Sequence, residues 1–187
     1  SGWVHGLSTI ASLIFAGNGK QFRKAILLSG DTSSKSISKE DKSAWPLFGD
    51  AGSATAIEFK QGADGLKFHF GTDGDGANAI IIKDGGYRNC VSEESFINKT
   101  FEEGIIRNNL QLQLDGMDVF AFAISKAPQS VNNTIEYFNI NKEAINYYIF
   151  HQANLFLNEK IRKKLKLDIS ISKTKKTTPP TCMSVNL

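Results

Sequence analysis

The alternation of short apolar runs with segments of helical periodicity constrains this chain more than any other feature. Strand-like runs lie at residues 24–28, 54–59, 66–70, 79–82, 119–124 and 145–150. Residues 3–15 and 153–165 carry apolar side chains at intervals of three and four, as amphipathic or buried helices do. Buried strands that alternate with helices predict an α/β fold with a mostly parallel sheet covered by helices.

Loops and one further helix complete this expectation. A proline is tolerated in the first turn of a helix but not in its interior, so a helix is expected to begin at Pro128 and to end near Tyr137. Residues 32–42 read as a polar loop, residues 92–112 as loop with irregular helix, and residues 182–187 as a terminal strand.

Size and composition exclude several classes of protein. A length of 187 residues allows one domain, or part of a larger one, at about 100–200 residues per domain. A net charge of +3 is too balanced for a dedicated nucleic-acid binder, and 41% apolar residues exclude wholesale disorder. Two cysteines exclude a disulfide scaffold, and no apolar run approaches the roughly 20 residues of a membrane span. The working class is a soluble cytoplasmic α/β protein.

The strongest local signal is a histidine at the end of an apolar run. His151 follows residues 145–150 directly, and a helical pattern begins at Ala153. In α/β sheets, ligands bind at the carboxyl ends of strands, where a neutral imidazole can donate to an oxyanion or transfer a proton. A histidine held by local hydrogen bonds is the competing interpretation.

Two further segments have a structural and a functional interpretation. The glycine-rich stretch 48–54 is predicted to be a tight turn pinned by Asp50, because it lacks the GK[ST] of a phosphate-binding loop. Basic residues cluster near 160–166 and form either a solvated surface or a docking site for an acidic partner. These residues are Lys160, Arg162, Lys163, Lys164 and Lys166.

The remaining cysteines and histidines are predicted to be structural. Cys90 lies in a polar stretch without a base nearby in the sequence, and Cys182 belongs to the terminal apolar run. His5 and His69 lie inside predicted elements and are expected to pack or to face solvent. None of them has neighbours at metal-ligand spacing, so no metal site is predicted.

Several segments, in a fixed order, resemble β-ketoacyl-[acyl-carrier-protein] synthase III, a condensing enzyme of the thiolase-like superfamily. The matching segments are residues 1–7, the FGDAGSA turn within 47–54, the turns at 71–74 and 85–88, residues 117–120, the histidine motif 150–155 and residues 177–187.

The resemblance implies a fold, a reaction and a site. The fold would be α/β, with thiolase-like αβαβα layers in two similar halves, the first of them incomplete here, and the protein a homodimer. The reaction would condense an acyl-CoA starter with malonyl-[acyl-carrier-protein], with loss of carbon dioxide and without a cofactor, in fatty-acid or related acyl biosynthesis. His151 would be catalytic and Lys42 would bind CoA. The acyl-carrier-protein site would comprise Gln152, Ala153, Asn154, Leu155, Phe156, Lys163 and Lys164.

The resemblance also implies boundaries and two departures. Residues 1–60 would complete the N-terminal half, residues 61–114 would hold connecting strands and a variable insertion, and residues 115–187 would form the C-terminal half. The nucleophilic cysteine of the family would stand directly before Ser1, so we expect the sequence to be a piece of a longer protein; the alternative is that another chain supplies the missing part of the first half. No asparagine precedes Thr177 where the family has Gly-Asn-Thr-Ser, so either the protein lacks it or a few residues are missing between Ser172 and Thr177.

Two other functions stay open at this point. Loss of the asparagine would favour an acyltransferase on the same fold that moves an acyl group without decarboxylation. A residue before Ser1 that cannot act as a nucleophile would favour a non-catalytic partner subunit. The acyl chain length cannot be read from the sequence, although the long polar region 90–112 is a candidate for starter choice.

Overall fold

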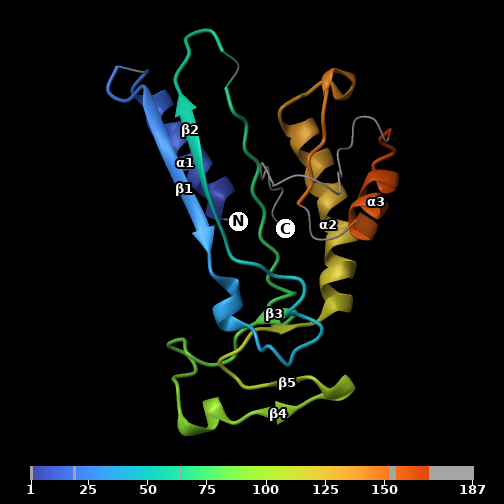
Figure 1. The fold of residues 1–187 in the computed structure, drawn as a ribbon. Coiled ribbons are helices and arrows are strands. Elements are labelled where there is room, and N and C mark those ends of the chain that lie inside the picture. The colour runs from blue at the N-terminus through green and yellow to red at the C-terminus, as the bar shows by residue number, and fades with distance from the viewer. Residues whose placement is uncertain (1, 19, 64, 152–154, 169–187) are drawn as a thin grey trace. The chain divides into compact units, whose positions relative to one another are not determined.

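The computed structural model describes residues 2–18, 20–63, 65–151 and 155–168 (Figure 1). Contacts divide the chain into two compact units. Unit 1 comprises Ser1–Gly30, Gly52–Gly71 and Ala123–Leu187, and unit 2 comprises Asp31–Ala51 and Thr72–Phe122. The elements follow in this order: α1 (Gly2–Ala16), β1 (Lys24–Asp31), η1 (Ser33–Ser36), β2 (Ala51–Glu58), β3 (Ile80–Ile81), η2 (Glu93–Phe96), β4 (Lys99–Thr100), η3 (Glu102–Gly104), β5 (Ile106–Arg107), β6 (Gln113–Leu114), α2 (Gly116–Tyr137), η4 (Lys142–Ala144) and α3 (Leu155–Lys164), where η marks short 3-10 helices.

Unit 1 contains a two-stranded sheet of β1 and β2 with α1 on one face (Figure 1). The helix expected at 3–15 and the strands expected at 24–28 and 54–59 are confirmed. The expected parallel pairing is wrong for these strands, because their arrows in Figure 1 point in opposite directions. Parallel neighbours are usually joined through an α-helix, and residues 32–50 between β1 and β2 hold none, only the short 3-10 helix η1.

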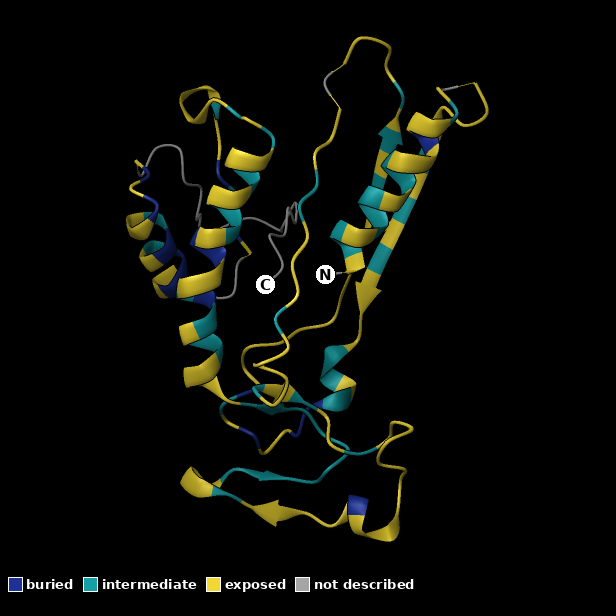
Figure 2. Ribbon diagram, turned by 180° about the vertical axis from the view of Figure 1, so that it is seen from behind, coloured by how far each residue is buried: buried dark blue, intermediate teal, exposed yellow. Residues whose placement is uncertain are grey.

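Close packing joins α1 to this sheet. Gly6 lets the helix approach β1, because a Cβ at that position would lie 2.7 Å from Cδ1 of Leu27. The indole Nε1 of Trp3 donates to Oγ1 of Thr55 on β2 at 2.9 Å. On the opposite face of β1, Ile26 and Leu28 are 68% and 74% exposed (Figure 2). The strand is thus apolar on both faces, the pattern of a strand that belongs between two layers.

Helix α2 corrects two sequence predictions. Residues 119–124 were expected to form a buried strand, and Pro128 was expected to begin a helix, but both lie inside α2. The signal that decides this is Asp115, whose Oδ1 accepts from the backbone N–H groups of Met117 and Asp118 at 3.0 Å each. This N-cap satisfies two of the free donors of the first turn, so the helix begins well before the proline.

Two other predicted strands are not formed. Within the part of the chain that the structure describes, residues 66–70 belong to no strand, and residues 145–150 have a single bridge at Tyr148 in place of a strand. Tyr148 and Phe150 are nevertheless buried, at 7% and 4% exposure. The alternation of apolar residues predicted the buried side chains correctly, but it could not supply the neighbouring strand that a ladder requires.

Both α2 and α3 end in the same hydrogen-bonded motif. After α2, Ile140 N–H donates to the Ile135 carbonyl, and Asn139 takes a φ of 48°. After α3, Leu167 N–H donates to the Arg162 carbonyl, and Lys166 takes a φ of 56°. These are Schellman endings, in which the left-handed position favours glycine or asparagine. Lysine at position 166 is therefore strained.

Replacing Lys166 with glycine should stabilise the protein. Glycine removes the left-handed penalty of about 1–2 kcal/mol, offset in part by its greater freedom in the unfolded chain. We expect a net gain of about 0.5–1 kcal/mol in the free energy of unfolding, measured by urea denaturation. Lys166→Ala is the control, since it removes the charge and keeps the strain; an equal gain there would show that charge, and not backbone strain, is responsible.

Unit 2 is built around short antiparallel ladders. β3 pairs with β6, and β4 pairs with β5 in a hairpin whose turn contains Gly104 at a φ of 73°. The hairpin is tied to the preceding loop, because Oγ of Ser38 donates to the Ile106 carbonyl at 2.6 Å. Asp41 is fully buried there and accepts from Nη1 of Arg107 at 2.8 Å. The region expected to be loop with irregular helix is therefore held by one buried ion pair.

Candidate active site

His151 lies at the end of the extended apolar segment 145–150. Phe150, buried directly before it, fixes the backbone from which the imidazole projects. The residue is exposed, yet protein atoms around the ring desolvate it, and this burial lowers the pKa of His151 below its ordinary value of 6.5. The imidazole is therefore neutral at pH 7, with an N–H to donate and a nitrogen to accept.

The predicted docking residues fall into two groups. Gln152, Ala153 and Asn154 lie outside the described residues. Leu155 and Phe156 begin α3 and are 46% and 62% exposed. The helix buries its other face through Leu157, Asn158 and Ile161. Leu155 and Phe156 thus present apolar surface to solvent at the start of the helix that follows His151.

The basic residues of α3 make different contacts. Arg162 donates to the Glu159 carboxylate and to the Leu167 carbonyl, so its guanidinium group is bound to groups at the end of its own helix. Lys164 donates through Nζ to the Ile124 carbonyl of α2 at 3.1 Å. Lys160 lies 5.1 Å from the centre of the Phe156 ring. Helical spacing predicted the cluster, but not which of its cations are bound to other groups of the protein.

Lys42 is exposed and directly follows Asp41 in unit 2. Burial alone raises the pKa of Asp41, but hydrogen bonds from Ser43 and Arg107 and from two backbone amides outweigh it and lower the pKa. Arg107 also lies with its guanidinium carbon 4.6 Å from the centre of the Phe101 ring. No local pattern in the sequence indicates the Asp41–Arg107 pair, whose members stand 66 positions apart.

The tight turn predicted for residues 48–54 is not formed, because Ala51–Ala54 already belong to β2. Asp50 has a structural role nevertheless: its carboxylate accepts from the backbone N–H of Ser34 at 2.9 Å and from the Ser34 hydroxyl at 2.6 Å. These hydrogen bonds lower the pKa of Asp50. They tie the start of β2 to η1.

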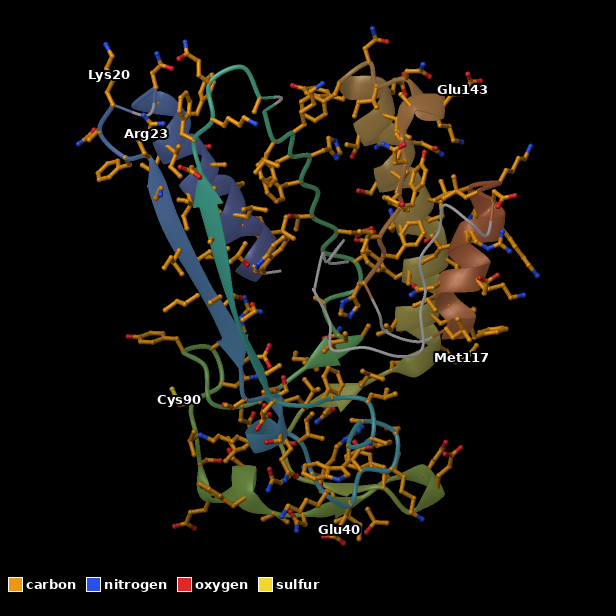
Figure 3. All side chains as sticks on the ribbon, turned by 45° about the horizontal axis from the view of Figure 1, so that its top comes forward. Lys20, Arg23, Glu40, Cys90, Met117 and Glu143 are labelled. Atoms are coloured by element: carbon orange, nitrogen blue, oxygen red, sulfur yellow. The ribbon has the colours of Figure 1, made fainter. Side chains whose placement is uncertain are left out.

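The other candidate residues also occupy structural or surface positions. Cys90 is exposed in unit 2 (Figure 3), and Cys182 lies outside the described residues. His5 stacks on Phe70 with ring centres 4.3 Å apart. His69 lies 6.1 Å from the Tyr137 ring, and its buried Nδ1 has no hydrogen-bond partner among the described residues.

Among the residues that the structure describes, no three His, Cys, Asp or Glu side chains are grouped so as to hold a metal ion. None of the helices in the described ranges is long and apolar enough to cross a membrane.

Comparison with known proteins gives one consistent result. The family described as 3-Oxoacyl-[acyl-carrier-protein (ACP)] synthase III matches residues 1–74. A 3-oxoacyl-[acyl-carrier-protein] synthase 3 of Campylobacter jejuni is 32% identical over 168 residues, which are 90% of this chain and 46% of that protein. The β-ketoacyl-[acyl-carrier-protein] synthase III of Clostridioides difficile is 28% identical over 170 residues, covering 90% of this chain and 48% of that protein.

Solved structures agree with the sequence relatives. A 3-oxoacyl-(acyl-carrier-protein) synthase III is 34% identical with a TM-score of 0.85, over 92% of this chain and 51% of that chain. The β-ketoacyl-[acyl-carrier-protein] synthase III of Thermus thermophilus is 27% identical with a TM-score of 0.70, over 91% and 49%. The chain therefore spans about half the length of the proteins it matches.

The helix-covered sheet and these structural likenesses define an α/β protein of the thiolase-like layered class. Within that class, the chain is similar to the 3-oxoacyl-[acyl-carrier-protein] synthase III proteins, whose family model matches residues 1–74.

Proposed function

We propose that the protein condenses an acyl-CoA starter with malonyl-[acyl-carrier-protein], with loss of carbon dioxide, in fatty-acid or related acyl biosynthesis. The observation that carries this proposal is the position of His151 directly after the buried Phe150, where burial lowers the pKa of the imidazole, in a chain similar to these synthases. A neutral donor fixed in this way suits a reaction in which negative charge develops on a thioester oxygen.

The proposed reaction has two half-reactions. A cysteine directly before Ser1, at the N-terminal end of α1, attacks the acyl-CoA carbonyl; a C–S bond to the cysteine forms and CoA thiol leaves. The helix dipole at that end lowers the pKa of a thiol and favours the attacking thiolate. No resident cofactor is required.

In the second half-reaction, malonyl-[acyl-carrier-protein] loses carbon dioxide and leaves an enolate. His151 donates to its thioester oxygen and stabilises the charge, so the step depends on this N–H. The carbanion then attacks the acyl-enzyme carbonyl, a carbon–carbon bond forms, and the cysteine thiolate leaves. The 3-oxoacyl product stays on the carrier protein.

The proposed partners follow from this reaction. Acidic carrier protein would dock on α3, where Leu155 and Phe156 are exposed and Lys163 faces solvent. Lys42 would contact the CoA end of the starter, and Gln152–Asn154 would complete the carrier site. A homodimer in the cytoplasm is proposed from the family resemblance, as are the boundaries near residues 60 and 114.

Acyl trapping tests the proposed function. The full-length protein is incubated with radiolabelled acetyl-CoA and longer acyl-CoA thioesters, and the labelled residue is identified by peptide mapping. We expect a thioester on a cysteine directly before Ser1 and its discharge by malonyl-[acyl-carrier-protein] with release of carbon dioxide.

Cys90→Ser is the matched control, because that exposed thiol is predicted to be structural. It should leave both labelling and discharge unchanged. Label on Cys90 would contradict the nucleophile assignment. Transfer to an alcohol or amine without release of carbon dioxide would identify an acyltransferase, and absence of any acyl-enzyme would identify a non-catalytic subunit.

A further inference from the structure

Helix α2 lacks one hydrogen bond of the regular helical pattern, because a proline lies inside it. Pro128 is buried inside the helix and has no N–H, so it cannot donate to the carbonyl of residue 124, one turn earlier. A carbonyl left in this way requires a donor from a side chain, from water or from another element.

The donor comes from α3. Nζ of Lys164 lies 3.1 Å from the Ile124 carbonyl oxygen, across 40 positions of sequence. The two helices lie side by side in Figures 1 and 2, and α2 is buried next to this point at Ala123 and Ala127. The ammonium group therefore supplies the hydrogen bond that the proline removes.

The contact separates Lys164 from its neighbours. Lys160, Lys163 and Lys164 are all exposed, but Nζ of Lys164 is bound to a carbonyl of α2, whereas Lys160 lies against the Phe156 ring. A lysine bound to a carbonyl of its own protein is less available to an acidic partner than a lysine whose ammonium group is fully hydrated.

We propose that Lys164 is a positioning residue: it completes the hydrogen bonding of α2 at Pro128 and so holds α3, which begins shortly after His151. The charge that meets an acidic carrier protein then comes from Lys163 and Lys160. The link to catalysis rests on the proposed function, whereas the link between Lys164 and Pro128 does not.

A double-mutant cycle tests the link. Lys164→Met should lower the melting temperature of the full-length protein by about 2–4 °C, because a hydrogen bond from a charged donor is lost. In a Pro128→Ala background, the alanine N–H can donate to Ile124, so the same substitution should cost no more than about 1 °C. Equal losses in both backgrounds would overturn the proposal.

Two further variants work in the background with Pro128 intact. Lys163→Met is the matched control, since it also removes a cation from the last turn of α3, and it should change the melting temperature little. Lys164→Arg keeps a long donor and should retain most of the stability. If Lys164→Arg lowers the melting temperature as much as Lys164→Met does, the proposal is overturned. This comparison tests the proposal even if Pro128→Ala folds poorly.

Steady-state kinetics separate positioning from docking. Lys164→Met should lower kcat for condensation about threefold or more, with the KM for malonyl-[acyl-carrier-protein] within about twofold. Lys163→Met should instead raise that KM, and more strongly at low salt. A salt-dependent rise in KM for Lys164→Met, with unchanged melting temperature, would show a docking cation and overturn the proposal. The melting temperature can be measured whether or not the protein catalyses the proposed reaction. A negative result in the double-mutant cycle is therefore distinguishable from failure of the proposed function.

Discussion

His151→Ala should abolish most of the condensation while leaving acylation of the enzyme largely intact. Loss of one donor to a developing oxyanion costs about 3–4 kcal/mol, or roughly 100- to 1000-fold in rate. Formation of the acyl-enzyme does not pass through the malonyl enolate, so it should slow much less. The two half-reactions are measured separately in the full-length protein, by acyl-CoA labelling and by release of carbon dioxide from malonyl-[acyl-carrier-protein].

His5→Ala is the control for the loss of an imidazole elsewhere in unit 1. His5 is exposed and stacks on Phe70, so its removal should change neither half-reaction by more than about twofold. If His151→Ala releases carbon dioxide near the parent rate, His151 has only a structural role and the proposed mechanism fails.

Arg107→Met should destabilise unit 2 strongly. The substitution leaves Asp41 with no exposed surface and without its cation, and breaking a buried pair from one side costs about 3–5 kcal/mol. We expect a fall in melting temperature of roughly 6–12 °C at neutral pH. Differential scanning calorimetry of the full-length protein measures it.

The control is an ion pair at the surface. Lys24 and Glu58 lie 3.7 Å apart with side chains 78% and 59% exposed, and such pairs contribute about 0–1 kcal/mol. Lys24→Met should therefore shift the melting temperature by no more than about 3 °C. Comparable falls in melting temperature for Lys24→Met and Arg107→Met would show that burial of the Asp41–Arg107 pair does not determine its contribution to stability.

The same pair predicts a pH dependence. The pKa of Asp41 is lowered in the folded protein, so its contribution is fully present above the ordinary pKa of 3.8. The contribution is lost as the pH falls below that value and through the lowered pKa. In Arg107→Met the melting temperature should therefore depend less on pH between about 5 and 2 than in the parent. An identical acid profile in both proteins would contradict this assignment.

The sequence by itself determined the class of the protein and the elements whose signals are local. The spacing of apolar residues was enough to predict α1, β1, β2 and α3. The order of short motifs indicated the family, which the comparisons then bore out. His151 could be singled out because a histidine directly after an apolar run is visible in the residues themselves.

Reliance on local signals also explains the two wrong predictions in α2. A buried helix and a buried strand have similar apolar composition, so residues 119–124 were assigned to a strand although Asp115 caps a helix there. Pro128 was placed at a helix start because the sequence alone shows no partner for the carbonyl that a proline leaves free.

The tertiary structure decided everything that depends on a distant partner. The lysine bound to Ile124 is 40 positions away, and the arginine bound to Asp41 is 66 positions away. The direction of strand pairing also depends on distant partners, as do the contacts that bind some of the α3 cations within the protein. Periodicity reports which face of an element is buried, but a specific hydrogen bond or ion pair depends on which atoms the folded chain brings within about 3 Å.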